Sequence, residues 1–364
     1  MKRLIAGMAA ALLAAVLFFP VKAHAVSAQS YILIDGTTGA VLDQCCSDKR
    51  SLIASTTKIM TALVVCEQTN VLDRVRIPVE AVGIEGSSMY LQSGEVLTVQ
   101  ELLYGLMLRS GNDAAVALAI YTGGTVEGFA QLMNDKAHRL GLENTHFVNP
   151  HGLDAPDHYS TAADLAKLTA YAMNNPIFAK TVSTRTVTIG NRVLQNHNKL
   201  LWQLEGADGV KTGYTKASGR ILVSSVVRND RRQICVTINA PDDWNDHKTL
   251  HENGFESFQM TRLLEKGQCV GTVFVAGGQG ECVSLVVAQD VYYPLRDGEI
   301  PELILPVPGF VYAPVVAGGS AGYGNICLKG TLLKRVELFY ADTVEMENSS
   351  APFSWRSLWK GRTS

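Results

Sequence analysis

Three short motifs, far apart along the chain, supply a nucleophile, a base and a cation. They are Ser55-Thr-Thr-Lys58, Ser110-Gly-Asn112 and Lys211-Thr212-Gly213. Each of the first two is expected roughly once by chance in a chain of this length, whereas Lys-Thr-Gly is rarer. If the three motifs act together, the fold must bring positions 55, 110 and 211 to one cleft. No other feature of the sequence restricts the fold so strongly.

Ser55 and Lys58 are predicted to form a nucleophile and its base. Ser55 opens a predicted helix, so its Oγ and its amide lie at the positive end of the helix dipole. Lys58 falls on the same helix face, within hydrogen-bonding reach of Ser55. A lysine accepts a proton at neutral pH only if its pKa falls from about 10.4 toward 7. Burial beside apolar residues such as Leu63, and a second cation at Lys211, would both lower it.

The other two motifs are predicted to supply proton transfer and substrate binding. Ser110 and Asn112 lie at a corner between two predicted helices, as a proton shuttle and a hydrogen-bonding partner for a substrate amide. Lys211 lies in a predicted strand and can bind an anionic group, and Gly213 leaves room for a peptide along the strand edge. The amides of Tyr214 and of the predicted nucleophile are expected to form an oxyanion hole.

Charge and composition exclude several classes of protein. The chain has 32 basic and 34 acidic residues, a net charge of −2 and no charged block, so nothing resembles a nucleic-acid-binding surface. With 47% hydrophobic residues it is too apolar for a disordered chain. At 364 residues it is long enough for two domains.

Residues 1–25 are predicted to be a secretory signal peptide. Two basic residues precede an almost wholly apolar stretch, Leu4–Val21, and Ala23-His-Ala25 has the small residues of a cleavage site. The alternative is an uncleaved anchor, since 18 residues nearly span a bilayer; Pro20 favours cleavage. The mature chain, with a net charge of −5, is therefore expected outside the cytoplasmic membrane, at its outer face or in the cell wall.

Hydrophobic periodicity divides the mature chain into two domains and a tail. Residues 26–262 contain a hairpin at 31–42, helices at 55–68, 101–108, 114–121, 129–140, 161–173 and 246–260, and strands at 186–189, 210–214, 221–228 and 233–238. Residues 263–345 are rich in Val, Gly and Pro and predict a small all-β domain. Residues 346–364 predict a polar linker and an amphipathic tail that contacts a membrane surface, with a disordered terminus as the alternative.

The cysteines and histidines give no metal signature. The seven cysteines show no zinc-type spacing, and Cys66 and Cys235, inside apolar runs, are predicted to be buried. Adjacent Cys45 and Cys46 are not expected to pair, and a bridge among the three C-terminal cysteines stays open.

His247 and His251 stand four residues apart on a predicted helix and could bind a metal, but without a third ligand a solvated helix face is favoured. His151 and His197 are predicted to hold loops by hydrogen bonds. The sequence therefore predicts neither a metal nor an organic cofactor.

The motif set resembles that of the penicillin-recognising serine peptidases, and more closely that of the low-molecular-mass D-alanyl-D-alanine carboxypeptidases. Further segments of this resemblance are residues 54–61, 108–115, 149–154, 197–201 and 208–215. It implies an α+β fold: a β-lactamase/DD-peptidase-like catalytic domain, with a five-stranded antiparallel sheet flanked by helices, followed by a small all-β domain. The resemblance is detailed over residues 28–260, and beyond 265 it rests on placement and β texture.

The resemblance implies a serine-type D-Ala-D-Ala carboxypeptidase that acts on peptidoglycan stem peptides through an acyl-enzyme and is inhibited covalently by β-lactams. The implied catalytic residues are Ser55, Lys58 and Ser110, and the implied substrate-binding residues are Asn112, Lys211, Thr212, Gly213 and Tyr214.

The sequence departs from the family pattern at two places. Many members carry an arginine after the last strand of the catalytic domain, which helps to hold the terminal carboxylate of the substrate. Residues 242–248 contain none, with His247 or Lys248 nearest, so carboxylate binding is expected to depend more on the Lys-Thr-Gly motif. Ser218-Gly219 replaces the commoner Ala-Gly, which is expected to alter the rim of the site.

Three other classes of protein fit the sequence less well. A class A β-lactamase needs a Glu-x-x-Leu-Asn segment, which does not occur between Asn112 and Lys211. A Ser-His-Asp hydrolase needs a Gly-x-Ser-x-Gly turn, and none of the histidines of the mature chain is associated with such a turn. A non-catalytic cell-wall-binding protein on the same scaffold is disfavoured because all three motifs are intact.

Overall fold

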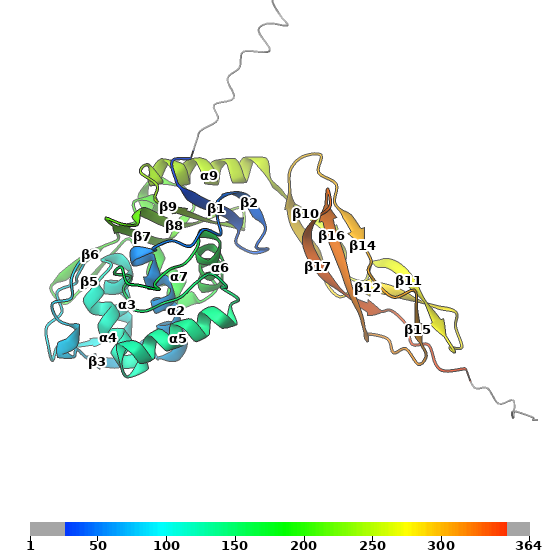
Figure 1. Ribbon diagram of the computed structural model, residues 1–364, viewed down its shortest axis with the longest axis horizontal. Helices are drawn as coiled ribbons and strands as arrows, with labels where there is room; N and C mark the ends of the chain where they lie inside the picture. The colour runs from blue at the N-terminus through cyan, green and yellow to red at the C-terminus, as the bar shows by residue number, and fades with distance from the viewer. Residues whose placement is uncertain (1–25, 348–364) are drawn as a thin grey trace, which may run out of the picture. The chain divides into compact units, whose positions relative to one another are not determined.

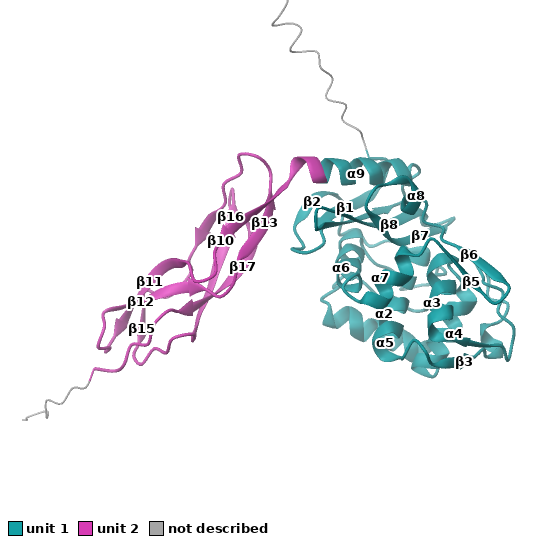
Figure 2. Cartoon of the chain, turned by 180° about the vertical axis from the view of Figure 1, so that it is seen from behind, with its two compact units in different colours: residues 1–254 teal, residues 255–364 magenta. Residues whose placement is uncertain are grey.

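The computed structural model describes residues 26–347, which form two compact units divided between Gly254 and Phe255 (Figure 2). The predicted signal peptide, and the predicted linker and tail beyond Glu347, lie outside the described residues. In the described part of the chain, no helix combines the length and the apolar character needed to cross a bilayer.

The first unit is built on a five-stranded antiparallel sheet, as predicted, with the strand order β2-β1-β9-β8-β7 (Figure 1). Its strands are β1 Ser30–Asp35, β2 Val41–Cys45, β7 Ala207–Thr215, β8 Gly219–Arg228 and β9 Arg231–Ile238. Strand β1 of the N-terminal hairpin pairs with β9, which is the last of the five strands along the chain and the central one in the sheet.

Strand β9 shows why both faces of the sheet are covered. Its alternating sequence, Gln-Ile-Cys-Val-Thr-Ile from Gln233 to Ile238, puts successive side chains on opposite faces. Ile234 and its apolar neighbours two and four residues on join the main hydrophobic core with the helices. The polar side chains of Gln233 and Thr237 face helix α9 (Asp243–Ser257), which packs on the other face.

A layer of helices covers the core face of the sheet, and α9 covers the opposite face (Figure 1). The helices are η1 Ala54–Thr57, α2 Lys58–Gln68, η2 Val79–Ala81, α3 Val99–Leu108, α4 Asn112–Gly123, α5 Val126–Arg139, α6 Ala162–Ala172, α7 Pro176–Ser183 and α8 Leu200–Gln203. Every residue of α2 from Lys58 to Cys66 is buried, which makes it the central helix.

The predicted helices and strands of this unit all occur, with ends shifted by a few residues. Thr161 caps α6 by accepting a hydrogen bond from the Asp164 amide, as its sequence pattern indicated. The short helices α7 and α8 were not predicted. Three short strands were not predicted either: β3 Arg74–Arg76, β4 Val96–Thr98 and β6 Arg192–Gln195. β6 forms a small hairpin with the predicted strand β5 Thr186–Ile189.

The second unit is all-β, as predicted, with a core of its own that includes Leu285 and Leu338. A six-stranded sheet has the order β14-β16-β17-β12-β11-β15, and β10 pairs with β13. The strands are β10 Gln259–Leu264, β11 Cys269–Ala276, β12 Cys282–Val287, β13 Val291–Leu295, β14 Glu302–Ile304, β15 Phe310–Tyr312, β16 Ser320–Leu328 and β17 Thr331–Tyr340. Residues 318–322 read Gly-Gly-Ser-Ala-Gly, but they lead into β16 and not into the strand-to-helix turn of a hydrolase nucleophile.

All seven cysteines are free. Cys66 and Cys235 are buried as predicted, and adjacent Cys45 and Cys46 have unbonded sulfur atoms 3.6 Å apart. The bridge left open among the three C-terminal cysteines does not form.

Candidate active site

Ser55 and Lys58 meet at the junction of η1 and α2. Lys58 Nζ lies 3.1 Å from Ser55 Oγ, because three residues make about one turn at the start of a helix. Ser55 is half-buried, whereas the Lys58 side chain is entirely buried. The two side chains predicted to be nucleophile and base are therefore in direct contact.

The remaining contacts of Lys58 orient its amine. Nζ donates to Asn112 Oδ1 at 2.7 Å and to the backbone carbonyl of His151 at 2.6 Å. Both partners are acceptors only, so a neutral Lys58 uses its two hydrogens on them. Its lone pair is then left for the hydroxyl of Ser55. This is the arrangement that a general base requires.

The surroundings of Lys58 favour the neutral amine. Burial lowers the pKa of Lys58 well below its usual range, and the nearby Lys211 ammonium lowers it further. Asp113 has an opposing, smaller effect that raises the pKa. Desolvation therefore decides the balance, and it favours the neutral amine that a general base requires.

Lys211 lies on β7 and is also buried. Burial lowers its pKa to about 7, and its Nζ donates to the backbone carbonyl of Thr212 at 2.8 Å. Lys211 is thus only partly protonated near neutral pH, which limits it as a permanent positive charge.

Strand β7 passes directly against the start of η1. A Cβ atom added to Gly213 would lie 3.3 Å from the backbone nitrogens of Ser55 and Thr56, a tight contact that would require the strand or the start of η1 to shift slightly. The next residue, Tyr214, begins the exposed end of the strand. Ser55 and Tyr214 therefore line the same pocket.

One pocket of about 320 Å³ joins most of these groups. Its lining includes Ser55 from η1, Ser110 from the α3–α4 corner, and Thr212, Gly213 and Tyr214 from β7. The fold thus brings together three segments that are far apart in the sequence, as the motif order required.

Ser110 and Asn112 make contacts that differ from the expected ones. Ser110 lines the pocket, but its Oγ makes no hydrogen bond with any described residue, so the expected link to Lys58 is not formed. Asn112 is buried behind Lys58, and its Nδ2 donates to the Glu85 carbonyl at 2.5 Å. The Asn112 side chain thus contacts Lys58, and its binding to a substrate amide stays a prediction.

The two loop histidines also differ from each other. His151 accepts a hydrogen bond from the Leu153 amide at 3.2 Å, in agreement with a loop-holding role. His197 holds its loop only through its backbone, whose amide donates to the Leu108 carbonyl at 3.1 Å. The His197 side chain instead lines the pocket. Burial lowers the pKa of His197 to about 4, and the charges of Lys211 and Arg109 contribute to this lowering.

Two charged residues of the pocket were not among the predicted site residues: Arg220 on β8 and Asp243 on α9. Arg220 stands directly opposite Tyr214 in the β7–β8 pairing and lines the pocket with Asp243 and Trp244 from α9. Its Nη2 donates to Asp243 Oδ1 at 2.7 Å. Knowledge of the pairing register between β7 and β8 would have placed Arg220 beside Tyr214.

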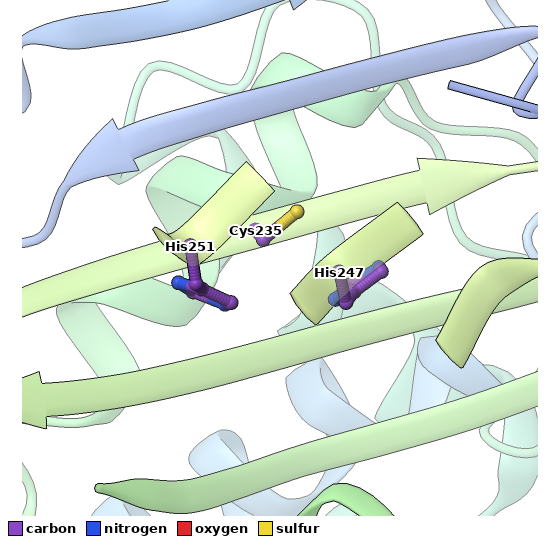
Figure 3. A group of neighbouring side chains, drawn as sticks. All are labelled: Cys235, His247 and His251. Carbon is purple, nitrogen blue, oxygen red and sulfur yellow. The ribbon is translucent and has the colours of Figure 1, made fainter. Parts of the chain in front are cut away.

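The expectation for His247 and His251 was wrong. Both side chains are fully buried between α9 and the sheet, and with Cys235 on β9 they make a close group of potential metal ligands (Figure 3). The helix face is polar because the sheet face that it covers is polar, and not because it meets solvent. His247 therefore lies beneath the sheet and outside the pocket, where it cannot bind a substrate carboxylate.

Protein groups satisfy both of these imidazoles. Ser224 Oγ lies 2.6 Å from His247 Nδ1 and 2.7 Å from His251 Nε2. The second nitrogen of His247 bonds to the Thr237 hydroxyl and that of His251 to the Gln233 side chain. Burial lowers the pKa of His247 well below its usual range and that of His251 to about 3. All four imidazole nitrogens are thus held by neutral hydrogen-bonding groups.

A five-stranded antiparallel sheet with helices on both faces, and a serine–lysine pair facing a Lys-Thr-Gly strand, define the class of penicillin-recognising serine peptidases. The chain belongs to the D-alanyl-D-alanine carboxypeptidase family, whose family model matches residues 18–242. A second family model, the C-terminal domain of penicillin-binding protein 5, matches residues 258–346.

Individual relatives agree with this assignment. The chain is 35% identical to D-alanyl-D-alanine carboxypeptidase DacF of Bacillus subtilis over 75% of this chain and 73% of that protein. It is 34% identical to DacD of Escherichia coli over 76% of each chain. Penicillin-binding protein 5 from Haemophilus influenzae has a similar structure, with a TM-score of 0.79, 31% identity, and coverage of 89% of this chain and 99% of that one.

Proposed function

We propose that this chain removes the terminal D-alanine from peptidoglycan stem peptides by serine acyl transfer. The observation that carries the proposal is the buried Lys58 amine, 3.1 Å from Ser55 Oγ, with its other two contacts made to carbonyl acceptors. Family membership supports the same reaction.

In the acylation step, Ser55 Oγ attacks the carbonyl carbon between the two terminal D-alanines, and Lys58 takes the hydroxyl proton. The lowered pKa of Lys58 supports this role, because a base must be neutral at the working pH. Negative charge develops on the carbonyl oxygen. The amides of Ser55 and Tyr214 are proposed to donate to that oxygen, at a helix start where the helix dipole also favours negative charge.

Collapse of the tetrahedral intermediate requires a proton for the departing D-alanine. We assign this transfer to Ser110, whose Oγ lines the pocket and has no hydrogen-bond partner among the described residues: its hydroxyl donates a proton to the departing amine and receives in exchange the proton that Lys58 took from Ser55. Thr212 and Lys211 are proposed to bind the terminal carboxylate, with Gly213 leaving room for the peptide. Asn112 is proposed to hold Lys58 in place. Water activated by Lys58 then hydrolyses the acyl-enzyme.

The pocket composition argues against the β-lactamase alternative. Among the described residues that line it, the single carboxylate belongs to Asp243, which is paired with Arg220. A penicilloyl ester on Ser55 therefore lacks a free carboxylate base for rapid hydrolysis, and β-lactams are expected to act as slow-release covalent inhibitors.

Release of D-alanine tests the proposal. Purified protein incubated with diacetyl-L-lysyl-D-alanyl-D-alanine should release one D-alanine per peptide, and Ser55→Ala should release none. A non-catalytic wall-binding protein would release none in either form, and release by Ser55→Ala equal to that of the unchanged protein would contradict the assigned nucleophile.

We also propose that residues 1–25 are removed on export. The catalytic residues 26–262, and the β-rich residues 263–345 that follow them along the chain, would then lie outside the cytoplasmic membrane. The tail, residues 346–364, is proposed to make a peripheral membrane contact. Export by a bacterial host should yield a mature protein whose N-terminal residue is Val26. A mature protein that still starts at Met1 would contradict the cleavage proposal. Flotation with anionic vesicles that is unchanged by deletion of residues 348–364 would contradict the membrane contact.

A further inference from the structure

A substrate that ends in D-Ala-D-Ala brings a carboxylate into the pocket, one residue beyond the carbonyl attacked by Ser55. Burying that anion without a cation or hydrogen-bond donors would be costly. This point rests on the function proposed above. The question is which group in the pocket supplies a lasting positive charge.

The groups expected from the sequence do not supply it. Lys211 is buried with a pKa lowered to about 7, and its Nζ already donates to a backbone carbonyl. His197 lines the pocket, but its pKa of about 4 leaves it neutral near pH 7. His247 is buried on the far face of the sheet. Among the described residues that line the pocket, Arg220 is the single arginine or lysine.

The position of Arg220 suits carboxylate binding. One of its donors is fixed by Asp243 at 2.7 Å, and the Asp243 side chain is only 4% exposed while that of Arg220 is 43% exposed. The guanidinium lies 5.8 Å from the centre of the Trp244 ring. It is therefore anchored on one side, and its planar fork of five N–H donors retains enough of them to hold a second carboxylate in bidentate fashion.

We propose that Arg220 joins the Lys-Thr-Gly motif in binding the terminal carboxylate of the substrate, and that its guanidinium sets the preference for peptides with a free C-terminus. Asp243 acts as a positioning residue that fixes the guanidinium. The positive charge thus comes from β8, opposite Tyr214, and not from the segment of residues 242–248 that follows the last strand.

Arg220→Gln tests this assignment with a pair of substrates, a peptide that ends in D-Ala-D-Ala and the same peptide with a C-terminal carboxamide. Loss of charge-assisted hydrogen bonds should lower kcat/KM for the free acid by about ten- to hundredfold, largely through KM. Turnover of the carboxamide should change little. Arg220→Lys should restore part of the preference, because it keeps the charge without the planar fork.

Arg228→Gln is the matched control, because Arg228 also lies on β8 and also pairs with α9, through Glu252 at 2.7 Å. It should leave the preference for the free acid unchanged. Two outcomes would overturn the proposal: an unchanged kcat/KM for the free acid in Arg220→Gln, or an equal loss on both substrates in a folded variant. Failure of the proposed function is separate, since the unmodified protein would then release neither D-alanine from the free acid nor D-alaninamide from the carboxamide.

Discussion

Lys58 Nζ lies 3.1 Å from Ser55 Oγ and 2.7 Å from Asn112 Oδ1, in a place that solvent does not reach. The first contact gives the amine a proton to accept, and the second fixes the direction of its lone pair. Burial provides the third requirement, a lowered pKa. Each of these properties can be tested separately.

Lys58→Met should slow acylation of Ser55 by about 10²- to 10⁴-fold, which is the usual contribution of a general base. The change removes the amine but keeps an unbranched side chain of similar length. Acylation by a fluorescent penicillin, followed over time, measures the loss. Lys136→Met is the control for removing a buried lysine, because Lys136 pairs with Glu67 at 2.7 Å away from the pocket. Acylation by Lys58→Met at the rate of this control would contradict the base assignment.

Lys211→Met should move the acid limb of the acylation rate to higher pH. The Lys211 charge disfavours a second charge on Lys58 and so lowers the pKa of Lys58. Without it the Lys58 pKa rises, and the neutral base appears only at higher pH. The position of the limb, not its height, is the measurement, because the substitution also weakens binding. A limb at unchanged or lower pH would exclude this coupling between the two lysines.

The buried histidines should make the first unit sensitive to acid. His247 and His251 have lowered pKa values when folded, with His251 at about 3, and ordinary values when unfolded. Their contribution to stability is complete above about pH 6.5 and is lost as the pH falls toward the folded values. For each of these two histidines, the free energy of unfolding should fall by about 1.4 kcal/mol per unit decrease in pH within that window.

Urea unfolding between about pH 7.5 and about pH 5, followed by the helical circular dichroism signal, measures this slope. His251→Gln should flatten the slope by about one proton's worth, whereas His138→Gln, at an exposed position, should leave it unchanged. Equal slopes in all three proteins would show that His251 is already protonated, or equally protonated, in both states.

Gly213→Ala should lower kcat for acylation by about ten- to hundredfold while the protein stays folded. The new methyl group would lie 3.3 Å from the backbone nitrogens of Ser55 and Thr56 and would push the oxyanion-binding amides apart. Gly309→Ala is the control, because a Cβ atom there meets nothing within 4 Å. A Gly213→Ala enzyme with unchanged kcat would mean that the strand can shift without harm to the site.

Much of this fold follows from patterns that act over short distances. The pattern from Gln233 to Ile238 predicted a strand, and the start of α6 was marked by its own cap. The contact between Ser55 and Lys58 was also predictable, since helix geometry alone brings the two side chains together.

The features that were missed depend on pairing between distant segments. Arg220 enters the pocket only because the β7–β8 register places it opposite Tyr214, and the sequence does not state that register. His247 and His251 were misjudged because polar helix faces usually meet water, whereas here they meet the polar face of a sheet. The engagement of Asn112 with Lys58 likewise requires α4 to pack beside α2.

Mass spectrometry of the protein after reaction with benzylpenicillin tests the central claim most directly. The account predicts one penicilloyl group per chain, on the peptide that contains Ser55, and no adduct in Ser55→Ala. An adduct on another residue, or an equal adduct in Ser55→Ala, would contradict it.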